Sequence, residues 1–177
     1  MIKRFLIITI ILNLLTLLGI VWANAMSPEE VVQKFCHLDA EGKRLSGDTW
    51  IEIAKFTTWV EDSGEMMVII EGFKVDNATI SDNTATVSVD YQLIGSTDTI
   101  EFTKPSKKWA NPYIYRLVRL VKQDGVWKIG APISAPHVYW EIVVSHLKEL
   151  QKREPVRREQ LESIINQIIN ERSKLKK

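Results

Sequence analysis

The sequence has only one cysteine, Cys36, among its 177 residues, and this scarcity excludes an internal disulfide. Packing must therefore hold the fold together. The 8 glycines and 6 prolines are too few for a collagen-like or low-complexity chain. The 23 basic and 22 acidic residues leave a formal charge of +1, so the chain lacks the basic field that is typical of nucleic-acid binding. We expect a globular protein with no nucleic-acid partner.

Motifs for several kinds of chemistry are also missing. No Gly-x-Ser-x-Gly turn is present for a nucleophilic serine, and the glycines occur singly instead of in a phosphate-binding loop. His37, His137 and His146 lack the spacing of a zinc site, and Cys36 lies on an apolar stripe. We therefore expect no metal, no cofactor and no catalytic residue.

The strongest functional pattern lies at the start of the sequence. Lys3 and Arg4 precede an apolar run over residues 5–22, and small residues follow at positions 23 and 25. This order is typical of a secretory signal peptide, which predicts cleavage between Ala25 and Met26 and a periplasmic or secreted protein. The alternative is an uncleaved anchor in the inner membrane, because the run spans 18 positions, which approaches the length of a membrane span.

The hydrophobic periodicity changes along the rest of the chain. A period near 3.6 predicts two N-terminal helices and two C-terminal helices, whereas a period of 2 between them predicts strands. The expected helices cover residues 27–39, 48–59, 142–154 and a segment from 155, and the expected strands cover 67–77, 86–93, 113–122 and 126–129. The pattern predicts an α+β fold, in which two N-terminal helices pack on a curved antiparallel sheet and two C-terminal helices form an extension.

The charge is unevenly distributed along the mature sequence. Residues 26–102 contain 5 basic and 15 acidic residues, whereas residues 103–147 contain 7 and 2, and residues 148–177 contain 9 and 5. The asymmetry suggests that the basic second half covers the acidic first half, or that two copies pair in this way. A homodimer is therefore one of the expected arrangements.

The helix start at residues 27–35 and the strand-turn-strand at 116–129 together resemble the nuclear transport factor two-like superfamily, also called ketosteroid isomerase-like or cystatin-like. The resemblance implies a cone-shaped sheet whose mouth holds a small molecule, an active site or nothing. It also implies that two copies can associate through the sheet. The predicted organisation is a signal peptide over residues 1–25, a domain of this type over 26–133 and a helical extension over 134–177.

Two groups of residues are candidates for binding. The first group is aromatic side chains with one arginine, which either line a cavity for a small apolar ligand or belong to the core. Its members are Trp59, Tyr91, Tyr115, Arg119 and Trp127. The second group is the apolar face of the last helix, which must be covered by the domain itself or by a partner. Its members are Leu161, Ile164, Ile165, Ile168 and Ile169.

The resemblance also allows an enzyme that uses a buried carboxylate in the cone. The candidate acids are Asp39, interpreted as the end of a helix, and Asp90, interpreted as solvated; Tyr91 and Tyr115 are the candidate donors. Asp90 and Tyr91 point to opposite faces of a strand, so they cannot share one pocket. We therefore expect an exported non-catalytic domain that binds a small apolar ligand or an envelope protein, with the cone-site enzyme as the alternative.

Overall fold

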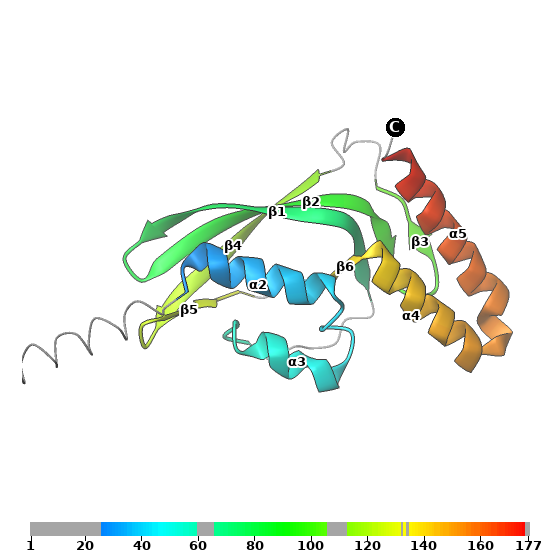
Figure 1. Cartoon of the computed structure of the whole chain (residues 1–177), viewed down its shortest axis with the longest axis horizontal. Coiled ribbons are helices and arrows are strands. Elements are labelled where there is room, and N and C mark those ends of the chain that lie inside the picture. Colours follow the sequence, from blue (N-terminus) through cyan, green and yellow to red (C-terminus); the bar gives the residue numbers. More distant parts are fainter. Residues whose placement is uncertain (1–25, 60–65, 106–112, 132, 134, 176–177) are drawn as a thin grey trace, which may run out of the picture.

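The computed structural model describes residues 26–59, 66–105, 113–131, 133 and 135–175. These residues form four α-helices and a curled sheet (Figure 1). The helices are α2 (Pro28–Ala40), α3 (Gly47–Ala54), α4 (Trp140–Arg153) and α5 (Arg158–Lys174), with a 3-10 turn, η1 (Pro155–Arg157), between the last two. The strands are β1 (Met67–Ser81), β2 (Thr84–Thr97), β3 (Phe102–Thr103), β4 (Tyr113–Gln123), β5 (Val126–Ile129) and β6 (His137–Tyr139).

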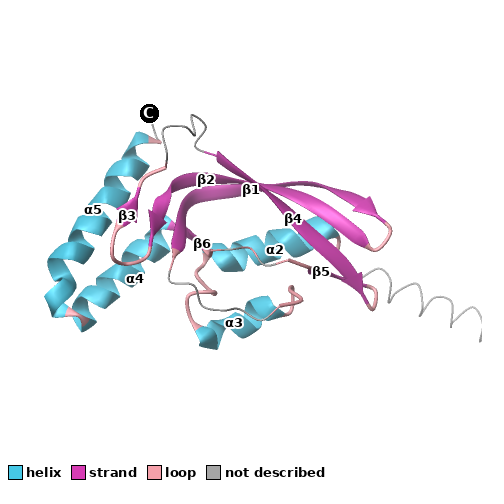
Figure 2. Cartoon of the chain, turned by 180° about the vertical axis from the view of Figure 1, so that it is seen from behind, coloured by secondary structure: helices cyan, strands magenta, loops and turns pink. Residues whose placement is uncertain are grey.

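The sheet has the strand order β5-β4-β2-β1-β6, and β3 pairs with β2 (Figure 2). All described pairs are antiparallel except β1 with β6. The register between β1 and β2 shifts at three places in β1, and such bulges increase the local bend and twist of a strand. The predicted α+β fold, with two N-terminal helices on a curved sheet and two helices at the C-terminal end, is confirmed.

Helix α2 shows why the first part of the chain folds as predicted. Ser27 and Glu30 form a capping box, in which the Ser27 backbone N–H donates to the Glu30 carboxylate at 2.7 Å and the Glu30 N–H donates to the Ser27 hydroxyl at 3.2 Å. Pro28 occupies the first turn, where its missing N–H costs nothing. The apolar stripe of α2, including Phe35 and Cys36, is buried against the concave face of the sheet.

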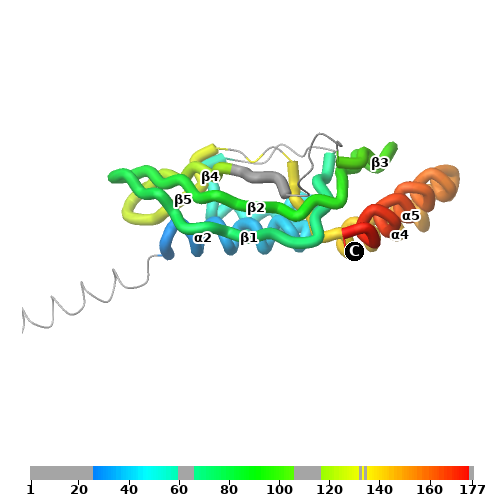
Figure 3. The backbone as a smooth tube through the Cα atoms, turned by 90° about the horizontal axis from the view of Figure 1, so that it is seen from above, coloured from blue at the N-terminus to red at the C-terminus, as the bar shows by residue number. Residues whose placement is uncertain are grey.

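The C-terminal helices pack on the chain through a core of their own. We call α4, η1 and α5 the helical arm, which extends beyond the end of the sheet opposite to the start of α2 (Figure 3). At this end both faces of β1 are buried, because Ile70 belongs to the core under α2 whereas Ile69 belongs to the core under the arm. Leu93 and Ile94 of β2 are divided in the same way.

Some element bounds differ from the prediction. The second helix ends at Ala54 instead of near residue 59, and β1 and β2 continue to Ser81 and Thr97. Strand β6 was not predicted, because its three residues follow Pro136 and are too few for a period to be recognised. Since β6 pairs with β1, the sheet continues past residue 133, which was the predicted end of the sheet domain.

Candidate functional site

A buried polar cluster joins the end of α2 to the start of β6. Asp39 lies in the last turn of α2, Arg44 in the following loop and His137 at the start of β6, and their exposed fractions are 0%, 5% and 1%. Asp39 Oδ2 lies 3.4 Å from Arg44 Nη1 and accepts a hydrogen bond of 3.1 Å from the His137 backbone N–H. Nδ1 of His137 lies 3.9 Å from the same carboxylate oxygen. One carboxylate therefore connects three segments that are distant in the sequence.

Arg44 extends this cluster to the backbone before β6. Its Nη2 donates to the Ile133 carbonyl at 2.8 Å, and its Nη1 lies 3.4 Å from the Ala135 carbonyl. The guanidinium fork is suited to several acceptors at once, and its charge balances that of Asp39 away from water. The ion pair thus fixes the segment that leads into the arm.

Tyr91 of β2 adds an aromatic ring to the cluster. Its ring stacks on the His137 ring with a centroid distance of 4.1 Å and an interplanar angle of 23°. Its hydroxyl lies 3.2 Å from the Cys36 sulfur. Burial raises the pKa of Cys36 to about 12 and also raises the pKa of Tyr91. Both groups therefore stay protonated at neutral pH, and neither is prepared to act as a nucleophile or a base.

The structure places three of the five residues predicted to bind an apolar ligand in or against the core under α2. Tyr91 and Trp127 are 1% and 8% exposed and belong to the core under α2, and Trp59 packs beside it with its ring 6.2 Å from that of Phe35. Arg119 is exposed on β4. The side chain of Tyr115 lies outside the described residues, although its backbone pairs with Asp90 of β2.

The two candidate acids are in different surroundings. Asp39 lies at the end of a helix, as interpreted, and its carboxylate is also fully buried beside Arg44. Asp90 is half-buried, and its neighbours Val89 and Tyr91 point into the core on the opposite face of β2. Arg44 and His137 were missed as partners of Asp39. Arg44 follows Lys43 in a polar loop and His137 follows Pro136, so local pattern indicated surface positions for both.

The apolar face predicted on the last helix is covered mainly by the chain itself. Four of its side chains are buried in the core under the arm, whereas Ile169 remains 45% exposed. The four buried residues are Leu161, Ile164, Ile165 and Ile168. The sequence allowed either the domain itself or a partner to cover this face. Over these four residues, the domain itself covers it.

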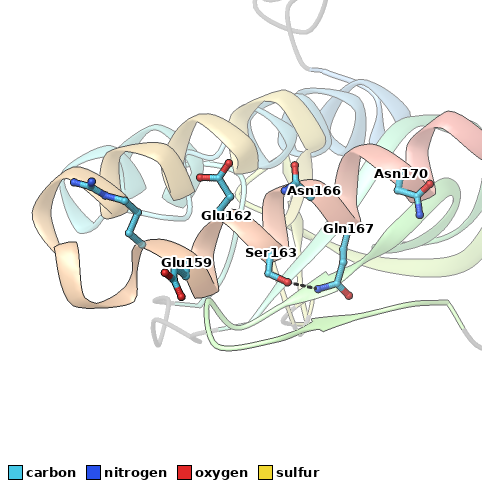
Figure 4. Close-up of a pocket in the computed structure, with 7 residues that line it drawn as sticks. Glu159, Glu162, Ser163, Asn166, Gln167 and Asn170 are labelled. Atoms are coloured by element: carbon cyan, nitrogen blue, oxygen red, sulfur yellow. Dashed lines mark hydrogen bonds between the residues drawn. The ribbon is translucent and has the colours of Figure 1, made fainter.

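The opposite, polar face of α5 forms a shallow hollow (Figure 4). Its volume is about 730 Å³, and charged, hydroxyl and amide side chains line it. The lining residues are Arg158, Glu159, Glu162, Ser163, Asn166, Gln167 and Asn170. Ser163 and Gln167 share a hydrogen bond of 3.4 Å on this face. The surface offers many donors and acceptors in a row along one helix.

No protein-family model, curated protein or solved structure matches this chain. Among the described residues, no group of three histidine, cysteine or acidic side chains is placed to hold a metal ion. No helix in this part of the chain is both long and apolar enough to cross a membrane. The predicted signal peptide, with its cleavage site at Ala25, lies outside the described residues.

Proposed function

We propose that this chain is an exported, non-catalytic interaction domain that binds a protein partner of the cell envelope along the polar face of α5. The hollow on that face carries the proposal, because it is a continuous surface of exposed polar groups on a helix whose other face is held in a core. The signal pattern over residues 1–25 supports export. The order of two helices before a curled sheet supports a nuclear transport factor two-like domain as the scaffold.

The chemistry of the hollow favours a protein segment over a small apolar ligand. Amide side chains such as Asn166, Gln167 and Asn170 both donate and accept hydrogen bonds, as the backbone and polar side chains of a partner require. An apolar ligand would satisfy none of these groups and would leave them desolvated. The partner therefore presents a polar surface to α5.

The buried cluster argues against the enzyme alternative. A cone-site acid must be reached by its substrate, whereas Asp39 is fully buried and held by Arg44 and the His137 backbone. Its neighbours Cys36 and Tyr91 are kept protonated by burial. These contacts support a structural role for the buried cluster. The surface of the arm then remains as the region that binds a partner.

Site-specific photo-crosslinking in the cell envelope tests this proposal. A photoreactive residue is placed at Asn166 or Asn170 in the full chain, and the same residue at the exposed Asp82 is the control. We expect one discrete adduct from both α5 positions and none from the control position. Equal labelling patterns at all three positions would refute the proposal.

The captured partner then permits a binding measurement with purified components. Asn166→Arg places a bulky charge in the hollow, and we expect it to weaken binding by about tenfold or more. Asp82→Asn, on the turn between β1 and β2, is the matched control and should bind as the parent does. An adduct with the mass of two chains would identify the partner as a second copy.

A further inference from the structure

The turn between α4 and α5 exposes apolar side chains at the end of the molecule. Val156 in η1 is 100% exposed, and Ile100 in the loop between β2 and β3 is 58% exposed. The two segments are joined, because Arg157 Nη2 donates to the Thr99 carbonyl and Gln160 Nε2 donates to the Ile100 carbonyl at 2.8 Å. The turn between α4 and α5 lies at one end of the molecule (Figure 1), and these two bonds hold the backbone of residues 99 and 100 beside the start of α5.

A second observation at the same end is a hollow lined by cations. It lies between α4 and α5, has a volume of about 390 Å³, and is lined by Lys148, Lys152 and Arg158 with one acid, Glu162. Lys152 binds Glu149 at 2.6 Å, whereas neither Lys148 nor Arg158 has an ion pair within the part of the chain that the structure describes. The lining of the hollow thus carries an excess of positive charge.

We propose that this end of the arm docks on an anionic lipid bilayer. Val156 and Ile100 enter the boundary of the acyl chains, while Lys148, Lys152 and Arg158 hold the headgroup phosphates. Apolar insertion and attraction of basic residues to anionic lipids add to each other in interfacial binding. Two protruding apolar side chains are too few for a stable protein interface, which takes about 20 residues or more on each side.

This surface goes beyond the proposed partner site on α5, and it rests on the proposed function for export to the envelope. The two hollows share Arg158 and Glu162, whereas Asn166 lines only the hollow on α5 and Lys148 lines only the hollow between α4 and α5. In an exported protein, the membrane surface of the envelope supplies the anionic lipid. Lys148→Gln should therefore affect lipid docking alone, and Asn166→Arg should affect partner binding alone.

The experiment places an environment-sensitive fluorophore on Val156→Cys or Ile100→Cys in the full chain. The native Cys36 does not compete for the label, because it is 1% exposed. Ile51→Cys on α3, where the native side chain is 76% exposed, is the control. The vesicles contain phosphatidylcholine alone or a mixture with about a third of phosphatidylglycerol, which supplies the negative surface charge. Any membrane association of residues 1–25 is common to all three proteins, so the comparison isolates the labelled position.

We expect a several-fold rise and a blue shift of emission at positions 156 and 100 with the anionic vesicles only, and no change at position 51. In the Val156→Cys chain, Lys148→Gln or Arg158→Gln should weaken the response by about fivefold each, and Arg158→Lys should retain it. Equal emission at positions 156 and 51 would overturn the proposal. A response that is unchanged by both glutamine substitutions, or equal on neutral vesicles, would overturn it as well.

Discussion

Arg44 Nη1 lies 3.4 Å from Asp39 Oδ2, and the two side chains are 1% and 0% exposed. Breaking a buried ion pair leaves one charge uncompensated in a medium of low polarity, which is much more costly than losing a surface pair. Here the pair also holds the backbone at Ile133 and at His137, through which the chain enters the arm. The stability of the connection between sheet and arm therefore depends on these two residues.

We expect Asp39→Asn to lower the free energy of unfolding by about 3 to 5 kcal/mol. The matched control is Glu52→Gln, which removes the partly exposed pair that Glu52 forms with Lys43 at 3.0 Å and should cost less than about 1 kcal/mol. Urea unfolding of the two variants and the parent measures the difference. Equal losses in both variants would mean that the buried pair contributes no more than a surface one.

The two isoleucines at positions 168 and 169 provide a test of the core under the arm. Ile168 is 0% exposed and Ile169 is 45% exposed, although they are adjacent in α5. Ile168→Ala should cost about 2 to 5 kcal/mol, because it removes buried methyl groups and leaves a cavity. Ile169→Ala should change stability by less than about 1 kcal/mol. Thermal or urea unfolding checks both values, and a reversed order would contradict the described orientation of α5.

Local sequence patterns were sufficient to predict single helices and turns. The capping signal at Ser27 and the period of the apolar residues placed α2 nearly to its end, and Asp124 with Gly125 placed the turn between β4 and β5. The same periodicity identified the apolar face of α5 but not what covers it. The cover consists of residues such as Ile69 and Ile94, which are distant in the sequence and pack there only because the sheet curls.

The buried cluster was unpredictable for a different physical reason. Arg44 and His137 are separated from Tyr91 by long stretches of chain, and no spacing rule connects them. Their residue types are more often exposed, so local pattern favours the surface for each of them. Arg44 can be buried because Asp39 and the carbonyls at Ile133 and Ala135 are its partners, and His137 lies between Asp39 and the Tyr91 ring, with its backbone N–H donating to Asp39.

Glu29 gives the fold a defined dependence on pH. Its carboxylate accepts a hydrogen bond of 2.8 Å from the Ala78 backbone N–H in β1, and this bond is the main reason why the pKa of Glu29 lies below the ordinary value of 4.5. The stabilisation is complete above the unfolded-state pKa and is lost as the pH falls through the lower folded-state pKa. Glu29→Gln should therefore cost about 1 kcal/mol near neutral pH and little under strongly acidic conditions.

Unfolding of the Glu29→Gln variant over a series of pH values measures this effect. Glu30→Gln is a suitable comparison, because the Glu30 carboxylate accepts its hydrogen bond from Ser27 at the start of the same helix. We expect the difference between the parent and Glu29→Gln to shrink on acidification below about pH 4.5. A difference that stays constant across this range would show that the carboxylate charge is not what binds the Ala78 N–H.

Arg172 fastens the last turns of α5 to the sheet and to α4. Its Nε and Nη2 donate to the two carboxylate oxygens of Glu71 at 2.9 and 3.0 Å, and its guanidinium carbon lies 4.4 Å from the Trp140 ring. Lysine cannot reproduce this paired geometry, although it keeps the charge. Arg172→Lys should therefore speed hydrogen exchange in the last turns of α5, and Arg172→Gln should speed it further. Lys174→Gln, which removes an exposed pair within the same helix, should have little effect.

The thiol of Cys36 should be unreactive in the folded protein. Burial raises its pKa to about 12, so the thiol stays protonated at pH 8, and the sulfur is covered by α2 and Tyr91. We expect no labelling by a maleimide in the native state and complete labelling in denaturant. An added cysteine at the exposed Ile51 should react at once under the same conditions, which verifies the reagent.

Tyr91→Phe removes the 3.2 Å contact but keeps the ring, so it should lower stability by about 1 kcal/mol and leave the thiol protected. Rapid labelling of Cys36 in that variant would show that the Tyr91 hydroxyl, and not the packing around it, protects the sulfur.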